Sequence, residues 1–241
     1  MPINRKYIKS IKDMAIDQKK KEDGFEQLEG ALTNSEQFIE KNQKMIVNVI
    51  IGLVVIVGLY FGYHKFIVEP KVNEAANQIF GAQNYFEQDS FQLALNGDGN
   101  ALGFIEIIEK YGSTPSGNLA CLYAGLSYLH TQEYENAIKY LEKFSSDDFL
   151  LANMATANIG DAYMQLGNFK KAAEYYQKAS ASKTNDFSTP TFLLKAGIAL
   201  EKANNYAGAL KVYEKIEKEY PNSMEARDIE KYIERAKLNN K

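Results

Sequence analysis

The feature that most constrains the fold is an apolar run, Met45–Tyr63, in which Asn48 is the only polar side chain and no residue is charged. A helix rises about 1.5 Å per residue, so this run reaches roughly 28 Å, close to the hydrocarbon thickness of a bilayer. A helix buried in a soluble core would carry a polar stripe, and none occurs before His64. Aromatic residues gather at its end, as at a membrane interface: Tyr60, Phe61, Tyr63 and Phe66. The run predicts one transmembrane helix over residues 45–66.

A cleaved signal peptide is the alternative interpretation of this run. The apolar region of a signal peptide spans about 7–15 residues behind a short basic segment. Here residues 1–44 come first, and the run ends in Gly-Leu-Tyr-Phe-Gly-Tyr-His-Lys, a poor cleavage site. We therefore interpret the run as a retained anchor. Within it, Gly58 and Gly62 form a Gly-x-x-x-Gly pair, which either packs against another membrane helix or is simply tolerated in lipid.

The segment before the run, residues 1–44, is predicted to be a basic and partly disordered tail. Residues 1–21 contain seven Lys and Arg residues against two Asp residues, and few large apolar residues. Positive charge in short loops marks the cytoplasmic side of a membrane. We expect the tail in the cytoplasm and the C-terminal domain on the opposite side of the membrane.

Composition excludes several function classes for the rest of the chain. The whole chain has a net charge of −3, and residues 69–241 account for −5, which argues against nucleic-acid binding. The single cysteine, Cys121, has no internal disulfide partner and is expected to be a small buried apolar residue. The two histidines, His64 and His130, have no partner at metal-ligand spacing. The sequence supports neither an enzyme nor a cofactor or metal site.

Three segments follow one pattern that starts at Gly125, Gly160 and Gly197, which are 35 and 37 residues apart. Apolar residues, mostly aromatic, recur three, nine and sixteen positions later, and alanine recurs twelve positions later. The matching sets are Tyr128, Tyr163 and Leu200; Tyr134, Phe169 and Tyr206; Ala137, Ala172 and Ala209; and Leu141, Tyr176 and Tyr213. Each copy is expected to pair two helices across a short polar turn. The predicted turns are His130–Glu133, Leu166–Asn168 and Ala203–Asn205.

The small residues in this pattern allow two helices to approach closely, and the aromatic residues fill the holes between successive hairpins. The pattern resembles the tetratricopeptide repeat, with its Leu-Gly-x-x-Tyr and Ala-x-x-x-Phe marks and a terminal proline. The chain departs from that pattern in having no tryptophan and proline in one copy only, at Pro221. We predict three repeats over residues 118–222.

Two further elements complete an all-α prediction. Residues 69–117 are expected to form a degenerate first hairpin from Val72–Gln88 and Ala101–Tyr111. The joint Asn96–Asn100 is interpreted as a plain turn, because a calcium loop would need Gly and Glu where Ala101 and Ile107 stand. Residues 223–241 are expected to form a capping helix, which a solenoid needs at its end. Its apolar face would consist of Ile229, Tyr232, Ile233 and Ala236.

In repeat solenoids the first helix of each hairpin lines the concave face. The predicted partner-binding residues are Leu122, Tyr123, Leu126 and His130 in the first copy, Met154, Asn158, Asp161 and Gln165 in the second, and Leu194, Lys195, Ile198 and Lys202 in the third. The helix Asn118–Leu129 is apolar all round and must be covered on every side. Either the first hairpin covers it, or it forms a groove for an apolar client or partner segment.

The order of basic tail, single anchor and acidic repeat domain resembles the YfgM family, single-pass ancillary subunits of the bacterial Sec translocon. Local likenesses are Glu109–Gly112 followed by Gly117–Ala120, and the segment Gln37–Asn42, which is similar to relatives from the Bacteroidetes. The resemblance implies an inner-membrane protein whose periplasmic domain contacts the translocon, a PpiD-like chaperone and emerging secreted clients. The residues leave open an envelope scaffold for cell-wall or division machinery, and an organelle-surface import receptor with cytosolic repeats.

Overall fold

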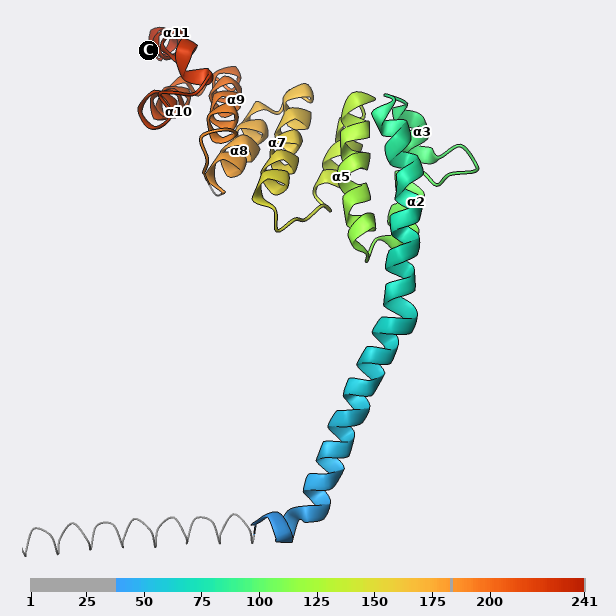
Figure 1. The fold of residues 1–241 in the computed structure, drawn as a ribbon. Coiled ribbons are helices and arrows are strands. Elements are labelled where there is room, and N and C mark those ends of the chain that lie inside the picture. Colours follow the sequence, from blue (N-terminus) through green and yellow to red (C-terminus); the bar gives the residue numbers. More distant parts are fainter. Residues whose placement is uncertain (1–37, 183, 241) are drawn as a thin grey trace, which may run out of the picture. The chain divides into compact units, whose positions relative to one another are not determined.

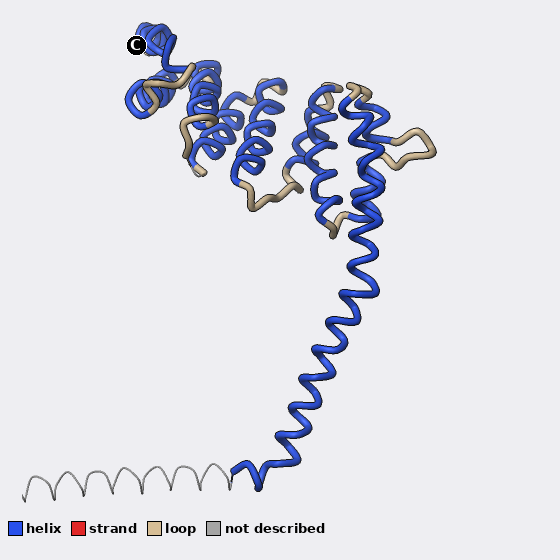
Figure 2. Tube along the Cα trace, viewed as in Figure 1, coloured by secondary structure: helices blue, strands red, loops and turns tan. Residues whose placement is uncertain are grey.

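A computed structural model describes residues 38–182 and 184–240. The predicted basic tail therefore lies outside the described residues as far as residue 37. Every regular element among the described residues is a helix, which confirms the all-α fold class (Figure 2). The chain divides into two compact units, Met1–Phe66 and Ile67–Lys241. Each unit is described separately below.

The described part of the first unit is helical over residues 38–63, and a π-helical turn, η1 (His64–Val68), follows it. Among the described residues one helical stretch, Phe38–Glu87, is long and apolar enough to cross a membrane, and none of its most apolar window is buried. The predicted run Met45–Tyr63 lies within it. An apolar helix whose side chains are not covered by protein is the pattern expected of a segment that lipid covers.

The second unit is a series of helices that contact their neighbours in chain order (Figure 1). Its elements are α2 (Glu69–Glu87), α3 (Phe91–Asn96), α4 (Phe104–Tyr111), α5 (Pro115–His130), α6 (Tyr134–Leu141), α7 (Phe149–Gln165), α8 (Phe169–Ala181), α9 (Thr189–Lys202), α10 (Tyr206–Glu219), the 3-10 turn η2 (Glu225–Asp228) and α11 (Ile229–Asn239). The pairs α5–α6, α7–α8 and α9–α10 meet at the three predicted turns.

One backbone geometry closes all three turns. Gln132, Gly167 and Asn204 stand at the same repeat position, and each has a positive φ, between 58° and 72°. The next residue of each turn donates its backbone N–H to the carbonyl oxygen five residues earlier, at 2.8–2.9 Å. A left-handed residue that ends a helix is usually Gly or Asn, and two of the three fit that preference. The turns therefore set the same reversal of direction in each hairpin.

The repeated glycine lies where the two helices of a hairpin touch. A Cβ atom added to Gly125 would stand 2.5 Å from Cγ of Leu141, and one added to Gly160 would stand 2.7 Å from Cε1 of Tyr176. A Cβ atom on Gly197 would overlap the ring of Tyr213. The alanines that recur twelve positions after each glycine are fully buried. The sequence pattern is therefore a packing pattern, in which a small residue accepts a large one from the partner helix.

The first hairpin repeats the same construction with an insertion that the sequence analysis did not identify. Asp89 has a positive φ of 56° in the α2–α3 turn. Ala82 and Ala94, seven positions before and five after it, are fully buried at the places of Gly125 and Ala137. Phe104 stands where the complete repeats have Leu141, Tyr176 and Tyr213, but it follows Ala94 by ten positions, whereas Tyr213 follows Ala209 by four. Six extra residues thus split the second helix into α3 and α4, and predicting one helix over Ala101–Tyr111 was incomplete.

The inserted loop is held by a network of hydrogen bonds around Asp98. Oδ1 of Asp98 accepts hydrogen bonds from the backbone N–H groups of Ala101 at 2.7 Å and Asn100 at 2.9 Å. Oδ2 accepts one from the hydroxyl of Tyr85 at 2.8 Å. The N–H of Ala101, followed by the Tyr85 hydroxyl, lowers the pKa of Asp98 to about 2. The carboxylate is used within the chain to fix the loop.

The last helix, α11, covers the end of the repeats, as predicted. Ile229, Ile233 and Ala236 are buried in the core that also contains Tyr213 and Ile216 of α10. Arg235 of α11 forms an ion pair with Glu201 of α9, Nη2 to Oε2, at 2.8 Å. This helix thus caps the solenoid by both apolar and charged contacts.

The glycine contacts predict a loss of stability on substitution. Gly197→Ala would gain about 1 kcal/mol of helix propensity, but its Cβ would displace the buried ring of Tyr213, and overpacking of this kind costs about 1–3 kcal/mol. We expect a net fall of up to about 2 kcal/mol in the free energy of unfolding, measured by chemical denaturation of the detergent-solubilised chain. Gly58→Ala, whose Cβ would meet nothing within 4 Å, is the control that should not lower this free energy. A rise of about 1 kcal/mol for Gly197→Ala, the helix-propensity gain without any cost, would contradict this packing.

The loop network predicts a pH dependence. Because folding lowers the pKa of Asp98, its contribution to stability is complete above the unfolded value near 3.9 and is lost as the pH falls through about 2. We expect a carboxyl titration midpoint near 2, measured by NMR on the full chain in micelles. Tyr85→Phe removes one donor and should raise that midpoint. A midpoint near 4 in the unaltered chain would show that the loop is not held in this way.

Candidate functional site

The first repeat places its predicted binding residues mostly inside the unit. Helix α5 contacts α2, α3 and α4 as well as α6 and α7. Leu122 is buried in the core shared by α5, α6 and α7, and Leu126 packs half-buried against the same core. The structure therefore supports cover of the apolar helix by the first hairpin, instead of an open groove. Leu122 lies away from the surface on which it was predicted.

The remaining two residues of the first copy belong to an aromatic cluster where α2, α3 and α4 meet α5. The ring of Tyr123 is half-buried and stacks on Phe104, with 5.4 Å between ring centroids and an angle of 11°. His130 is exposed and stacks on Phe91 at 4.3 Å and 6°. Stacking at this spacing is favourable beyond simple burial. Both side chains therefore help to hold the first hairpin against the first complete repeat.

The second and third repeats present their predicted residues more openly. Met154 is 52% exposed, Gln165 and Lys202 are exposed, and Asn158 and Ile198 are half-buried. We call the surface formed by these five residues the α7–α9 face. Leu194, which was predicted with them, packs against the C-terminal core. Since apolar, amide and cationic groups meet on this face, it can contact both the backbone and the side chains of a polypeptide.

Two predicted residues, Asp161 of α7 and Lys195 of α9, are brought together on this face by the fold. The Nζ atom of Lys195 lies 2.9 Å from Oδ1 and 2.8 Å from Oδ2 of Asp161. Oδ1 also accepts a hydrogen bond from the hydroxyl of the buried Tyr176 at 2.6 Å. Burial, and after it the charge of Asp161, hold the pKa of Tyr176 well above its usual value. The three side chains tie adjacent repeats together, so their main role is structural.

One contact beside this face was missed by sequence reasoning. The hydroxyl of Thr191 in α9 donates a hydrogen bond to Oε1 of Glu225 in η2 at 2.6 Å. Thr191 follows Met154 by 37 positions, the same interval that separates Gly160 from Gly197. Thr191 is therefore the equivalent of Met154 in the next repeat, and the repeat interval alone could have predicted that it lies on the same face.

A comparison with protein families agrees with this geometry. The tetratricopeptide repeat model matches residues 122–187 and 157–224, which together cover α6 to α10 and the greater part of α5. The chain contains tetratricopeptide repeats. No curated protein matches the sequence. The family match thus supports an interaction module and leaves the partner to be inferred from the site.

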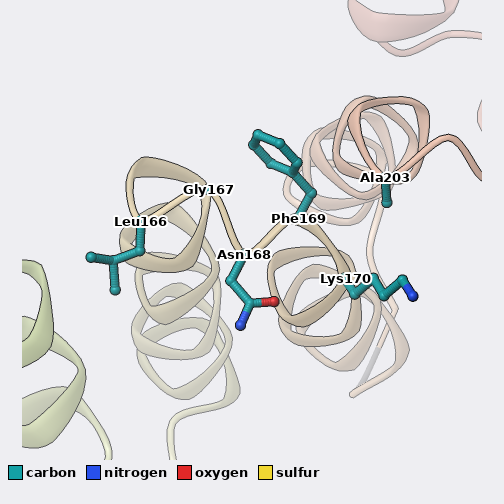
Figure 3. A pocket seen from close by; sticks show the side chains of 6 residues that line it. All are labelled: Leu166, Gly167, Asn168, Phe169, Lys170 and Ala203. Carbon is teal, nitrogen blue, oxygen red and sulfur yellow. The ribbon is translucent and has the colours of Figure 1, made fainter.

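The tetratricopeptide repeats also carry a hollow at the α7–α8 turn, with a volume of about 440 Å³ (Figure 3). It is lined by Leu166, Gly167, Asn168, Phe169, Lys170 and Ala203. Lys170 is the one charged residue of this lining, so the hollow offers contacts but no acid–base pair. The exposed Lys202 lies near it, with Nζ 5.5 Å from the ring centroid of Phe169. The hollow therefore adjoins the α7–α9 face.

The remaining residues considered in the sequence analysis are Cys121, the possible metal ligands and the glycine pair of the anchor. Cys121 is buried, and burial raises the pKa of its thiol, so a small apolar role fits it. Within residues 38–182 and 184–240, no group of three or more His, Cys, Asp or Glu side chains could hold a metal ion. An added Cβ at Gly58 or Gly62 would meet nothing within 4 Å. These two glycines therefore remain open to a neighbouring helix or to lipid.

The cluster around Asp161 predicts a measurable contribution to stability. Asp161→Ala would leave the buried Tyr176 hydroxyl without its acceptor and Lys195 without its counter-ion. We expect the free energy of unfolding to fall by about 1–3 kcal/mol, the usual cost of an unsatisfied buried polar group. Glu234→Ala, which removes an exposed ion pair with Lys237, should change it by less than about 0.5 kcal/mol. Equal effects of the two substitutions would refute this role for Asp161.

Proposed function

We propose that this protein is a membrane-anchored interaction module that binds protein partners through the α7–α9 face of its repeats. The proposal rests on the presence of two features in one chain. One is an apolar helix that no other part of the protein covers, and the other is a set of tetratricopeptide repeats with exposed apolar, amide and cationic side chains. An anchor of this kind keeps the binding surface close to a membrane, where partners at that membrane are at high local concentration.

The anchor is residues 45–66, and the repeats lie on the non-cytoplasmic side. The excess of Lys and Arg in residues 1–21 supports a cytoplasmic N-terminus. The acidic character of residues 69–241 is consistent with translocation, because long domains cross largely regardless of their charge. In a bacterium this arrangement places the repeats in the periplasm, at the inner membrane.

The α7–α9 face suits polypeptide binding for a chemical reason. Asn158 and Gln165 carry side-chain amides that both donate and accept hydrogen bonds, as an extended backbone requires. Met154 and Ile198 offer adaptable apolar contact beside them. The Asp161–Lys195 pair fixes the spacing of α7 and α9 and so preorganises the face.

The partners in this proposal are the Sec translocon, a PpiD-like chaperone and emerging secreted clients. Their identity rests on the resemblance to the YfgM family in the order of tail, anchor and acidic repeats. The protein would then act as an ancillary factor that holds a chaperone or a client beside the exit of the secretion channel. The proposed action is binding, without a chemical step.

Site-specific crosslinking tests this proposal in native membranes. We expect Met154→p-benzoylphenylalanine in the full-length chain to capture a translocon subunit or a membrane-anchored chaperone on irradiation. Leu238→p-benzoylphenylalanine, at an exposed position of α11, is the control that should capture neither. Captured proteins are identified by mass spectrometry.

Two outcomes would overturn the proposal. Capture of cell-wall or division proteins at Met154, with no translocon or chaperone component, would favour an envelope scaffold. Protease digestion of the repeats from the cytosolic side of sealed vesicles would reverse the orientation, and would favour a receptor with cytosolic repeats.

A further inference from the structure

Three large apolar side chains recur at one position of the repeat register. Leu150, Phe187 and Met224 follow one another at intervals of 37 positions, the interval that separates Gly160 from Gly197. They stand at the start of α7, just before α9 and just before η2, and the loops that lead into α7 and α9 lie at the same end of these helices (Figure 1). We call these three residues the apolar row.

The members of the apolar row are open to solvent. Their exposed fractions are 40% for Leu150, 87% for Phe187 and 76% for Met224. Single exposed apolar residues are ordinary on a soluble surface, but an array along one edge is typical of a contact surface. The row shares no residue with the α7–α9 face but adjoins it, because Leu150 precedes Met154 by one helical turn on α7.

The turn that carries Phe187 is held by hydrogen bonds of Asn185. Oδ1 of Asn185 accepts hydrogen bonds from the backbone N–H groups of Phe187 at 3.0 Å and Ser188 at 2.7 Å. The backbone N–H of Asn185 donates to Oγ1 of Thr189 at 2.8 Å. A ring held out by a fixed turn loses little conformational entropy when it is covered by a partner.

Carboxylates border the apolar row. The three segments of residues 145–150, 182–188 and 219–228 contain six Asp and Glu residues against two Lys and Arg residues. Two of these acids pair with lysines outside the segments, Glu219 with Lys215 at 3.8 Å and Asp228 with Lys231 at 3.2 Å, which leaves four acids against two basic residues. Asp148, Asp186 and Glu225 are the acids nearest in sequence to the three row members, and none of them forms an ion pair with a described residue. The edge therefore combines apolar area with negative charge.

We propose that this edge is a second docking surface, which binds a polypeptide segment that presents large apolar side chains next to Lys or Arg. The apolar row would contact the apolar side chains, and the bordering carboxylates would attract the basic ones and set the register. The same charge disfavours two other occupants. Anionic lipid would be repelled, and so would the equivalent acidic edge of a second copy. This inference goes beyond the proposed function, because it concerns residues outside the α7–α9 face and requires no named partner.

A binding measurement on the full-length chain in phosphatidylcholine nanodiscs tests the proposal. The probe is a short fluorescein-labelled peptide in which Leu and Phe alternate with Lys, followed by fluorescence anisotropy. We expect its counterpart with Glu in place of Lys to bind at least about tenfold more weakly. Phe187→Ser combined with Met224→Ser should weaken binding of the Lys peptide by about tenfold.

Matched controls separate this surface from the rest of the protein. Phe80→Ser removes another exposed aromatic ring, on α2, and should leave affinity unchanged. Asp186→Asn with Glu225→Gln should weaken binding and reduce its salt dependence, whereas Glu135→Gln, on α6, should do neither. As an independent readout, Phe187→p-benzoylphenylalanine should crosslink to the peptide, and Phe80→p-benzoylphenylalanine should not.

Four results would overturn the proposal. They are equal binding of the Lys and Glu peptides, equal binding of the Lys peptide to empty nanodiscs, unchanged affinity in the Phe187 and Met224 double variant, and no crosslink from position 187. If Met154→Ser abolished peptide binding while the row variants did not, the peptide would occupy the α7–α9 face. That result would remove the second surface and leave the proposed function intact.

Discussion

The close contact between a small residue on one helix and a large residue on its partner is what the repeat unit depends on. At Gly160 the ring of Tyr176 fills the space that a Cβ atom would occupy, and the pairs at Gly125 and Gly197 repeat this arrangement. Ala82 stands at the corresponding position of the first hairpin. Because interiors are close-packed, this contact sets how near the two helices lie and where the turn must reverse the chain.

The two ends of the solenoid are closed in different ways, and the difference decides which surfaces stay open. At the start, the split helix α3–α4 and the rings of Phe91 and Phe104 cover α5, so the most apolar helix of the repeats is used for packing. At the end, α11 adds Ile229 and Ile233 to the core and an ion pair to Glu201. The middle repeats therefore provide the accessible α7–α9 face and the apolar row.

The charged residues of the repeats have two kinds of task. Asp161, Glu201 and Asp98 are used within the chain, where each accepts hydrogen bonds or pairs with a cation from another element. Asp186 and Glu225 border exposed apolar side chains, and neither pairs with a described cation, although Oε1 of Glu225 accepts the hydrogen bond from Thr191. A carboxylate that is paired with a cation, or that has both oxygens hydrogen-bonded within the chain, contributes mainly to stability, whereas one with a remaining oxygen and no ion partner can contribute to recognition.

The sequence by itself determined the helical hairpins, their three turns, the capping helix and the apolar span, because these follow from local periodicity and from small residues at a fixed spacing. It also pointed to Asp161 and Lys195 as members of one face. Only the tertiary structure decided that Asp161 and Lys195 pair with each other, that Leu122 is buried, and that six extra residues divide α3 from α4. Which side chain is covered depends on the neighbouring repeat, and helical periodicity reports one helix at a time.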